Sequence, residues 1–110
     1  EARAEAGQRV AWIYYVRGQD AEARRVADTW RSGAAGDWSQ QSAWVSGLAS
    51  WRLNDCNAAS QAFRDVGTRA TEPSFAAAGY YWAARSEMAC RRPAAVESLL
   101  KAAARSSETF

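Results

Sequence analysis

The residue types that support most enzymatic chemistry are scarce in this 110-residue sequence. It contains no histidine, which excludes Ser-His and Cys-His nucleophile pairs and most zinc sites. The glycine-rich stretch 33–36 is not followed by Lys and Ser or Thr, so it does not match a phosphate-binding loop. The acidic residues are scattered, and no two of them are set up as an acid and a base. We therefore predict no catalytic residue, no cofactor and no metal in this chain.

The two cysteines, Cys56 and Cys90, are the first candidates for chemistry. Cys56 lies at the start of one predicted helix and Cys90 at the end of the next. If these helices are antiparallel neighbours, the two ends meet at one edge, and a disulfide is feasible at a Cα separation of about 5–6 Å. A disulfide would indicate an oxidising compartment such as the periplasm. The alternative is two free thiols that pack as small apolar groups.

The aromatic residues are the second candidates, because flat rings pack well against the faces of sugar rings. The sequence has six tryptophans and four tyrosines. Helical spacing places four tryptophans toward a core: Trp12, Trp44, Trp51 and Trp82. Trp38 follows the glycine-rich break and is the one we expect to be exposed. Trp38, Tyr15 and Tyr80 are therefore the candidate glycan contacts, and core packing is the alternative for every aromatic residue.

Six amphipathic helices would position these residues. Apolar residues at three- and four-residue steps predict a first helix over 2–16, with Ala6, Val10, Ile13 and Tyr14 on its buried face. Asp20 and Asp37 are predicted to cap the second and third helices. Cysteine 56 begins the fourth, and Pro73 and Pro93 begin the fifth and sixth. The last helix should bury four residues: Val96, Leu99, Leu100 and Ala103.

The six helices form three copies of one unit. Gly18, Asn54 and Arg91 superpose at offsets of 36 and 37 residues, close to the period of tetratricopeptide repeats. In the same register the first helix of each pair carries a small residue: Ala11, Gly47 and Ala84. A small residue lets the paired helix approach closely. We predict an all-α fold of three antiparallel pairs, over about 2–32, 38–67 and 73–106, stacked as a tetratricopeptide-like right-handed solenoid.

Length and charge add three expectations. One domain of helical repeats fits residues 1–110. The net charge of +2 gives no reason to expect a nucleic-acid partner, and no 18-residue apolar run predicts a membrane span. The sequence has no initiating methionine and no signal-peptide pattern, so we expect a piece of a longer protein.

Two stretches resemble the helical repeats of soluble lytic murein transglycosylases. They are residues 44–53 (WVSGLASWRL), followed by Ala58, Ala59 and Phe63, and residues 77–85 (AAGYYWAAR), followed by RRPAAVE and Leu99-Leu100. The ending 102–110 also resembles the segment where this family leaves its helical region. The resemblance covers most of the chain from residue 44 onward.

The resemblance implies a periplasmic bacterial enzyme that cleaves peptidoglycan glycan strands in a separate lysozyme-like domain. The family's catalytic glutamate precedes a serine, but Glu97-Ser98 here lies in an apolar-faced helix, so no catalytic role is transferred. The implied function is a non-catalytic scaffold that positions the glycan strand or the catalytic domain. The alternative is a tetratricopeptide-like module that binds a partner peptide in its concave face.

Overall fold

The computed structural model describes residues 2–33 and 36–107, and these fold as helices without a strand. The elements are α1 (Ala2–Val16), α2 (Asp20–Arg31), α3 (Asp37–Arg52), α4 (Cys56–Arg69), α5 (Pro73–Ala89), a short 3-10 turn η1 (Pro93–Ala95) and α6 (Val96–Ser107). The all-α prediction is confirmed, and the three predicted pairs match these bounds within two residues. None of the described helices is both long enough and apolar enough to cross a membrane.

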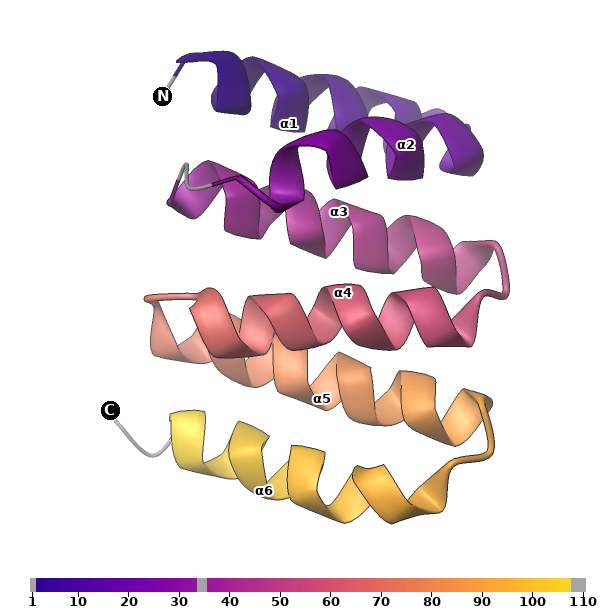
Figure 1. Cartoon of the computed structure of the whole chain (residues 1–110), viewed down its shortest axis with the longest axis vertical. Coiled ribbons are helices and arrows are strands. Elements are labelled where there is room, and N and C mark those ends of the chain that lie inside the picture. The colour runs from indigo at the N-terminus through magenta and orange to yellow at the C-terminus, as the bar shows by residue number, and fades with distance from the viewer. Residues whose placement is uncertain (1, 34–35, 108–110) are drawn as a thin grey trace.

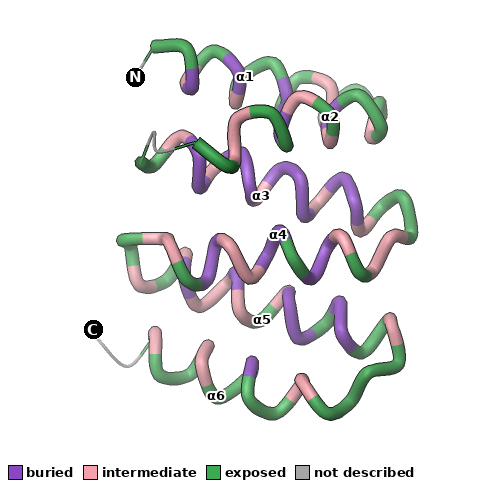
Figure 2. Tube along the Cα trace, viewed as in Figure 1, coloured by how far each residue is buried: buried purple, intermediate pink, exposed green. Residues whose placement is uncertain are grey.

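The helices follow one another along the longest axis of the molecule, from α1 at one end to α6 at the other (Figure 1). Each helix packs against the next helix in the chain, and α1 also packs against α3. Burial is greatest in the middle of this stack, above all along α3, and least in α1, α2 and α6 (Figure 2). The central helices therefore supply most of the core.

The same turn closes the first helix of each pair. Gly18, Asn54 and Arg91 have positive φ angles of 78°, 60° and 58°. At each turn the amide of the following residue donates to a carbonyl five residues earlier, at 2.9 Å in all three cases: Gln19 to Tyr14, Asp55 to Ser50 and Arg92 to Glu87. This is the Schellman arrangement, which ends a helix with a left-handed residue. The turns repeat in the register that the sequence predicted.

The predicted capping roles of Asp20 and Asp37 are wrong. Gln19 and Gly36 are the N-cap residues of α2 and α3, and neither caps through its side chain. The Asp20 carboxylate instead accepts hydrogen bonds from Arg52. Two helices do have side-chain caps: Asp55 accepts from the amide of Ala58, and Glu72 accepts from the amides of Ser74 and Phe75.

Small residues hold the paired helices close together, as predicted. Ala11 and Ala84 are at most 1% exposed, and Gly47 is also buried. A Cβ atom at Gly47 would lie only 2.6–2.8 Å from the ring of Phe63 on α4. Because Phe63 is itself 0% exposed, its ring has little room to move, and α3 and α4 need glycine at this position.

The predicted buried face of α1 is wrong for three of its four residues; Tyr14 is half-buried and packs against the core, whereas Ala6, Val10 and Ile13 are exposed. The residues that α1 buries are Ala4, Gly7 and Ala11, whereas Val10 is 44% and Ile13 47% exposed. The ring of Trp30 on α2 lies directly over Gly7, where a Cβ would come within 2.2–2.6 Å of it. Close approach to α2 thus selects the small-residue face of α1, and Val10, Trp12 and Ile13 are left exposed.

The prediction for α6 is also partly wrong. Leu99 is the residue that α6 buries, while Leu100 remains 43% exposed and Met88 on the neighbouring helix 63% exposed. Residues Val96 and Ala103 are half-buried. In the described chain α6 packs on α5 and on no other long helix, so Leu100 is left uncovered.

The contact at Gly47 generates a stability prediction. Replacing Gly47 with leucine should lower the free energy of unfolding by about 1–3 kcal/mol, because the added side chain overpacks against Phe63. The gain in helix propensity on leaving glycine, about 1 kcal/mol, offsets only part of this cost. Urea unfolding monitored by circular dichroism measures the change. Gly33→Leu is the control, because a Cβ there lies 3.7 Å from its nearest neighbour; equal stability of both variants would contradict the close contact.

Candidate functional site

An aromatic strip runs along the side of the molecule where α1 meets α3. It consists of Trp38, Trp12 and Tyr15, with Arg9 and Arg52 beside the rings. Trp12 and Trp38 line the same shallow hollow, together with Arg9 and two further residues of α1, Gln8 and Ile13. Trp12 also stacks on Tyr15, with ring centroids 5.4 Å apart and planes 30° from parallel. The strip therefore joins residues 23 positions apart in the sequence into one surface.

Both arginines of the strip lie over a ring. The Arg52 guanidinium is 3.7 Å from the centroid of Tyr15, and that of Arg9 is 5.7 Å from the centroid of Trp38. Each cation also has a carboxylate partner, since Arg9 pairs with Glu5 and Arg52 with Asp20. The two arginines cover part of the Tyr15 and Trp38 rings without leaving an excess of positive charge. Trp12 is the ring of the strip that is exposed, at 43%.

The structure brings two of the three candidate glycan residues together. Trp38 is half-buried, partly covered by Arg9, and Tyr15 is half-buried at the other end of the strip. Tyr80 lies elsewhere: its ring packs against Gly67 between α4 and α5, where a Cβ would be 2.7–2.8 Å from it. Tyr80 is thus part of a helix–helix contact, separate from the strip.

Trp12 is the residue that sequence reasoning missed. It was expected in the core, but its side chain is 43% exposed and it connects Trp38 to Tyr15. The physical reason is that α1 buries its small residues, which turns Trp12 toward the surface. The adjacent small residues Gly7 and Ala11 were the available signal, because a helix packed closely against its partner buries its smallest side chains.

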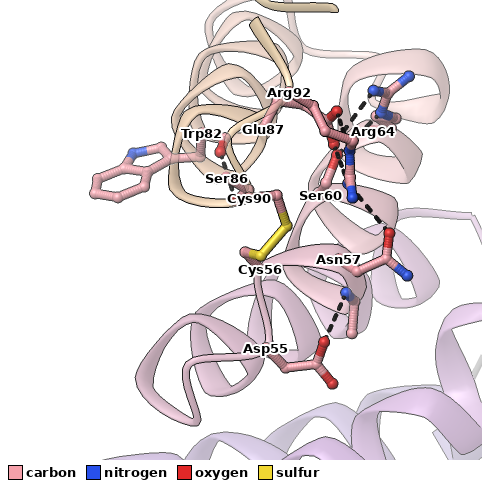
Figure 3. Close-up of a disulfide and its surroundings, with 11 residues drawn as sticks. Asp55, Cys56, Asn57, Ser60, Arg64, Trp82, Ser86, Glu87, Cys90 and Arg92 are labelled. Atoms are coloured by element: carbon pink, nitrogen blue, oxygen red, sulfur yellow. Dashed lines mark hydrogen bonds and ion pairs between the residues drawn. A yellow bond between two sulfur atoms is a disulfide. The ribbon is translucent and has the colours of Figure 1, made fainter.

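The disulfide prediction is confirmed in the structure. Cys56 at the start of α4 is bonded to Cys90 at the end of α5, with a Cα–Cα distance of 5.5 Å. Figure 3 shows the bond beside the turn that follows α5. The corresponding junction of the preceding unit carries the ion pair between Asp20 at the start of α2 and Arg52 at the end of α3. The two equivalent junctions are therefore both cross-linked at this edge, α2–α3 by an ion pair and α4–α5 by a disulfide.

A polar cluster lies next to the disulfide and joins the same two helices (Figure 3). The Glu87 side chain is only 4% exposed and accepts hydrogen bonds from Arg92 at 2.7 and 2.9 Å. Arg64 of α4 lies 3.6 Å from the same carboxylate, and Arg92 also donates to Asn57 at 3.1 Å. The charged partners thus compensate for the burial of Glu87.

This cluster shifts the ionisation of Glu87. The hydrogen bonds from Arg92 are the main cause that lowers the pKa of the carboxyl from 4.5 to about 2; burial opposes the shift, and Ser60 and Arg64 contribute to it. A general acid or base works best with a pKa near the operating pH. With its carboxyl ionised and paired with two arginines, Glu87 acts as a structural anchor of α5 on α4.

The lowered pKa makes a pH prediction. The Glu87 carboxyl binds a proton less tightly in the folded state than in the unfolded state. Its contribution to the free energy of unfolding is therefore present above about pH 4.5 and is lost as pH falls toward about 2. The contribution is on the order of 3 kcal/mol. Unfolding free energies of wild type and Glu87→Gln should therefore converge as pH falls from 7 to 2.5. Glu97→Gln, at a side chain 78% exposed, is the control; parallel profiles for wild type and Glu87→Gln would refute the anchor.

The disulfide makes a second stability prediction. The bond closes a loop between two residues 34 positions apart. For a loop of this length the chain-entropy model gives a stabilisation of the folded state of about 3–4 kcal/mol. Replacing both cysteines with alanine should lower the free energy of unfolding by this amount, measured in urea under non-reducing conditions. Alkylation of both thiols without reductant, in protein exported to an oxidising compartment, would show by intact mass that the bond is not formed.

Among the described residues no three histidine, cysteine, aspartate or glutamate side chains are grouped to hold a metal ion. The features of the described chain that bear on function are the aromatic strip, the disulfide and the polar cluster. Of these, the strip alone offers an exposed ring, that of Trp12, to a ligand. Comparison of the chain with protein-family models, curated proteins and solved structures gives no match.

Proposed function

We propose that this chain is a non-catalytic helical scaffold that holds glycan strands of peptidoglycan against its aromatic strip. In this proposal its three helix pairs form a tetratricopeptide-like right-handed superhelix belonging to a periplasmic lytic transglycosylase, and a separate domain of that enzyme cleaves the glycan. The three identical turns and the small residues between paired helices support a repeat architecture.

The exposed ring of Trp12 is the observation that carries the glycan proposal. Large aromatic side chains are usually buried, yet Trp12 is 43% exposed and stands between Trp38 and Tyr15. A sugar ring has a flat apolar face that packs against such rings. The strip is also longer than one ring, because it extends from Trp38 through the hollow to Tyr15. These features suit an extended chain of sugars better than a compact ligand.

The charges of the strip suit the same ligand. Arg9 and Arg52 are both paired with carboxylates, so the surface does not favour polyanions such as nucleic acids. The guanidinium N–H groups that are not used in these ion pairs can donate to sugar hydroxyls. Stacking supplies the affinity in this proposal, and hydrogen bonds from the framing side chains supply the orientation.

The disulfide supports the proposed location. Disulfides persist in oxidising compartments, of which the bacterial periplasm is one, and Cys56–Cys90 joins two helices at the centre of the fold. Peptidoglycan lies in the same compartment. Localisation in the periplasm and contact with the glycan are therefore consistent with each other, and both follow from the resemblance of residues 44–110 to the transglycosylase repeats.

A pull-down with purified peptidoglycan tests this function. Wild type should sediment with the glycan, and Trp12→Ala and Trp38→Ala should each weaken binding about 2–10-fold, the loss expected for one stacked ring. Tyr81→Ala is the matched control, because Tyr81 is 44% exposed on α5, outside the strip. Circular dichroism should show the same helix content in all four proteins.

Two results would contradict the proposal in different ways. Wild type that does not sediment would assign the module to the alternative, a helical-repeat surface that binds a partner peptide. Loss of binding in Tyr81→Ala equal to that in Trp12→Ala would show that the glycan is not held by the strip.

A further inference from the structure

A polar hollow lies beside the disulfide, where α4 packs on α5 (Figure 3). Its lining comes from α4 (Asn57, Ser60, Gln61 and Arg64), from α5 (Glu87) and from the turn after α5 (Arg92). Both helices also pack against a further helix, α4 against α3 and α5 against α6. The polar hollow is therefore formed at an internal junction of the stack.

Two arginines and one carboxylate give the polar hollow an excess of positive charge. The Glu87 side chain is only 4% exposed, whereas those of Arg64 and Arg92 are 43% and 45% exposed. One oxygen of Glu87, Oε2, lies 3.6 Å from Nη2 of Arg64 and 2.7 Å from Nη2 of Arg92. The buried carboxylate therefore holds two accessible cations close together, and its single charge neutralises only one of them.

Each guanidinium keeps donors that the protein does not use. Arg92 donates to Glu87 from Nε and Nη2 and to Asn57 from Nη2, and Arg64 donates to Ser60 from Nε. Within the described chain, the Nη1 group of neither arginine donates a hydrogen bond. Guanidinium groups with unused N–H donors suit a carboxylate, because its two oxygens can accept from both of them.

The preceding junction, between α2 and α3, has the opposite balance of charge. In the register of the repeats, Ser60, Arg64, Glu87 and Arg92 correspond to Arg24, Asp28, Ser50 and Asp55. One arginine and two carboxylates thus occupy the positions that hold two arginines and one carboxylate in the polar hollow. Arg24 still joins the helices there, since it pairs with Asp55 at 2.9 Å. Packing of one helix pair on the next therefore does not require an excess of positive charge.

We propose that the polar hollow binds the free carboxylate at the end of a peptide, with one oxygen accepting from Arg64 and the other from Arg92. A single carboxylate carries the one negative charge that neutralises the polar hollow, whereas a phosphate dianion would place excess negative charge beside Glu87. The side-chain amides of Asn57 and Gln61 can both donate and accept, which matches the peptide group that precedes a terminal carboxylate. The polar hollow shares no residue with the aromatic strip, so this site goes beyond the glycan proposal.

Titration with a small peptide acid, followed by NMR of the isotope-labelled protein, tests the proposal. N-acetyl-alanyl-alanine should shift the amide signals of α4 around Gln61, with a dissociation constant of about 1–10 mM. The same dipeptide with a C-terminal amide lacks the charge and should bind about 10-fold more weakly. Arg64→Gln should weaken binding of the acid about 10-fold, because a charge-assisted contact is lost. Gln61→Glu should weaken it similarly, since it adds a second carboxylate and leaves both arginines in place.

A matched control separates the site from general charge effects. Arg25→Gln also removes an arginine, but one of α2 that is 64% exposed and pairs with Glu22 outside the polar hollow, so it should bind the acid as wild type does. Wild type without saturable shifts up to about 50 mM peptide overturns the proposal. Equal affinity for the acid and the amide, or a loss in Arg25→Gln equal to that in Arg64→Gln, also overturns it. Circular dichroism of each variant verifies that the helices are retained.

The chirality of the dipeptide distinguishes two sources of such a carboxylate. Tighter binding of the form with two D-alanines would identify the peptide stems of peptidoglycan as the source, because these stems end in D-alanine. Tighter binding of the form with two L-alanines would identify the C-terminus of a protein. Either preference supports a site for a peptide carboxylate.

Discussion

The distance between neighbouring helices is the constraint on which the rest of this structure depends. Where Gly47 meets Phe63 and Gly79 meets the backbone of Gly67, a single added Cβ would be within 2.8 Å of its neighbour. Helices this close bury their small residues and direct the large ones to the sides. In α1 the residue against α2 is Gly7, which lies under the ring of Trp30. The exposure of Trp12 and Val10 follows, because they lie on other sides of the helix.

Ion pairs and a disulfide between successive helix pairs also restrain how one pair sits on the next. Each junction between the second helix of one pair and the first helix of the next has a polar or covalent tie near the same edge: Asp20–Arg52 at the first and Cys56–Cys90 with Arg64–Glu87 at the second. A surface ion pair contributes little by itself. A buried carboxylate with two arginines and a disulfide restrict the junction far more, so α4 and α5 form the most strongly connected part of the stack.

Much of the fold could be predicted from the sequence because its determinants are local or repeat. Gly18, Asn54 and Arg91 mark three equal turns, and the spacing of Ala11, Gly47 and Ala84 indicates the paired helices. The disulfide followed from that pairing. The outward face of α1 could not be predicted by periodicity, since this helix carries apolar residues on several sides. Asp20 does not cap α2 as expected, because its carboxylate accepts a hydrogen bond from Arg52, 32 positions away. The strip joins α1 to α3, and no local pattern encodes that contact.

The covalent bond between α4 and α5 also determines the order in which the molecule comes apart. In a linear stack each unit is held only by its neighbours, so separation starts where the fewest contacts have to break. The helices α1 and α6 bury few residues, and both can detach while Cys56 and Cys90 still hold the middle. We therefore expect backbone amides of α1 and α6 to exchange with solvent through local opening, and those of α4 and α5 to exchange only when the centre of the stack separates. The aromatic strip, which joins α1 to α3, therefore has one of its two helices at an end of the stack.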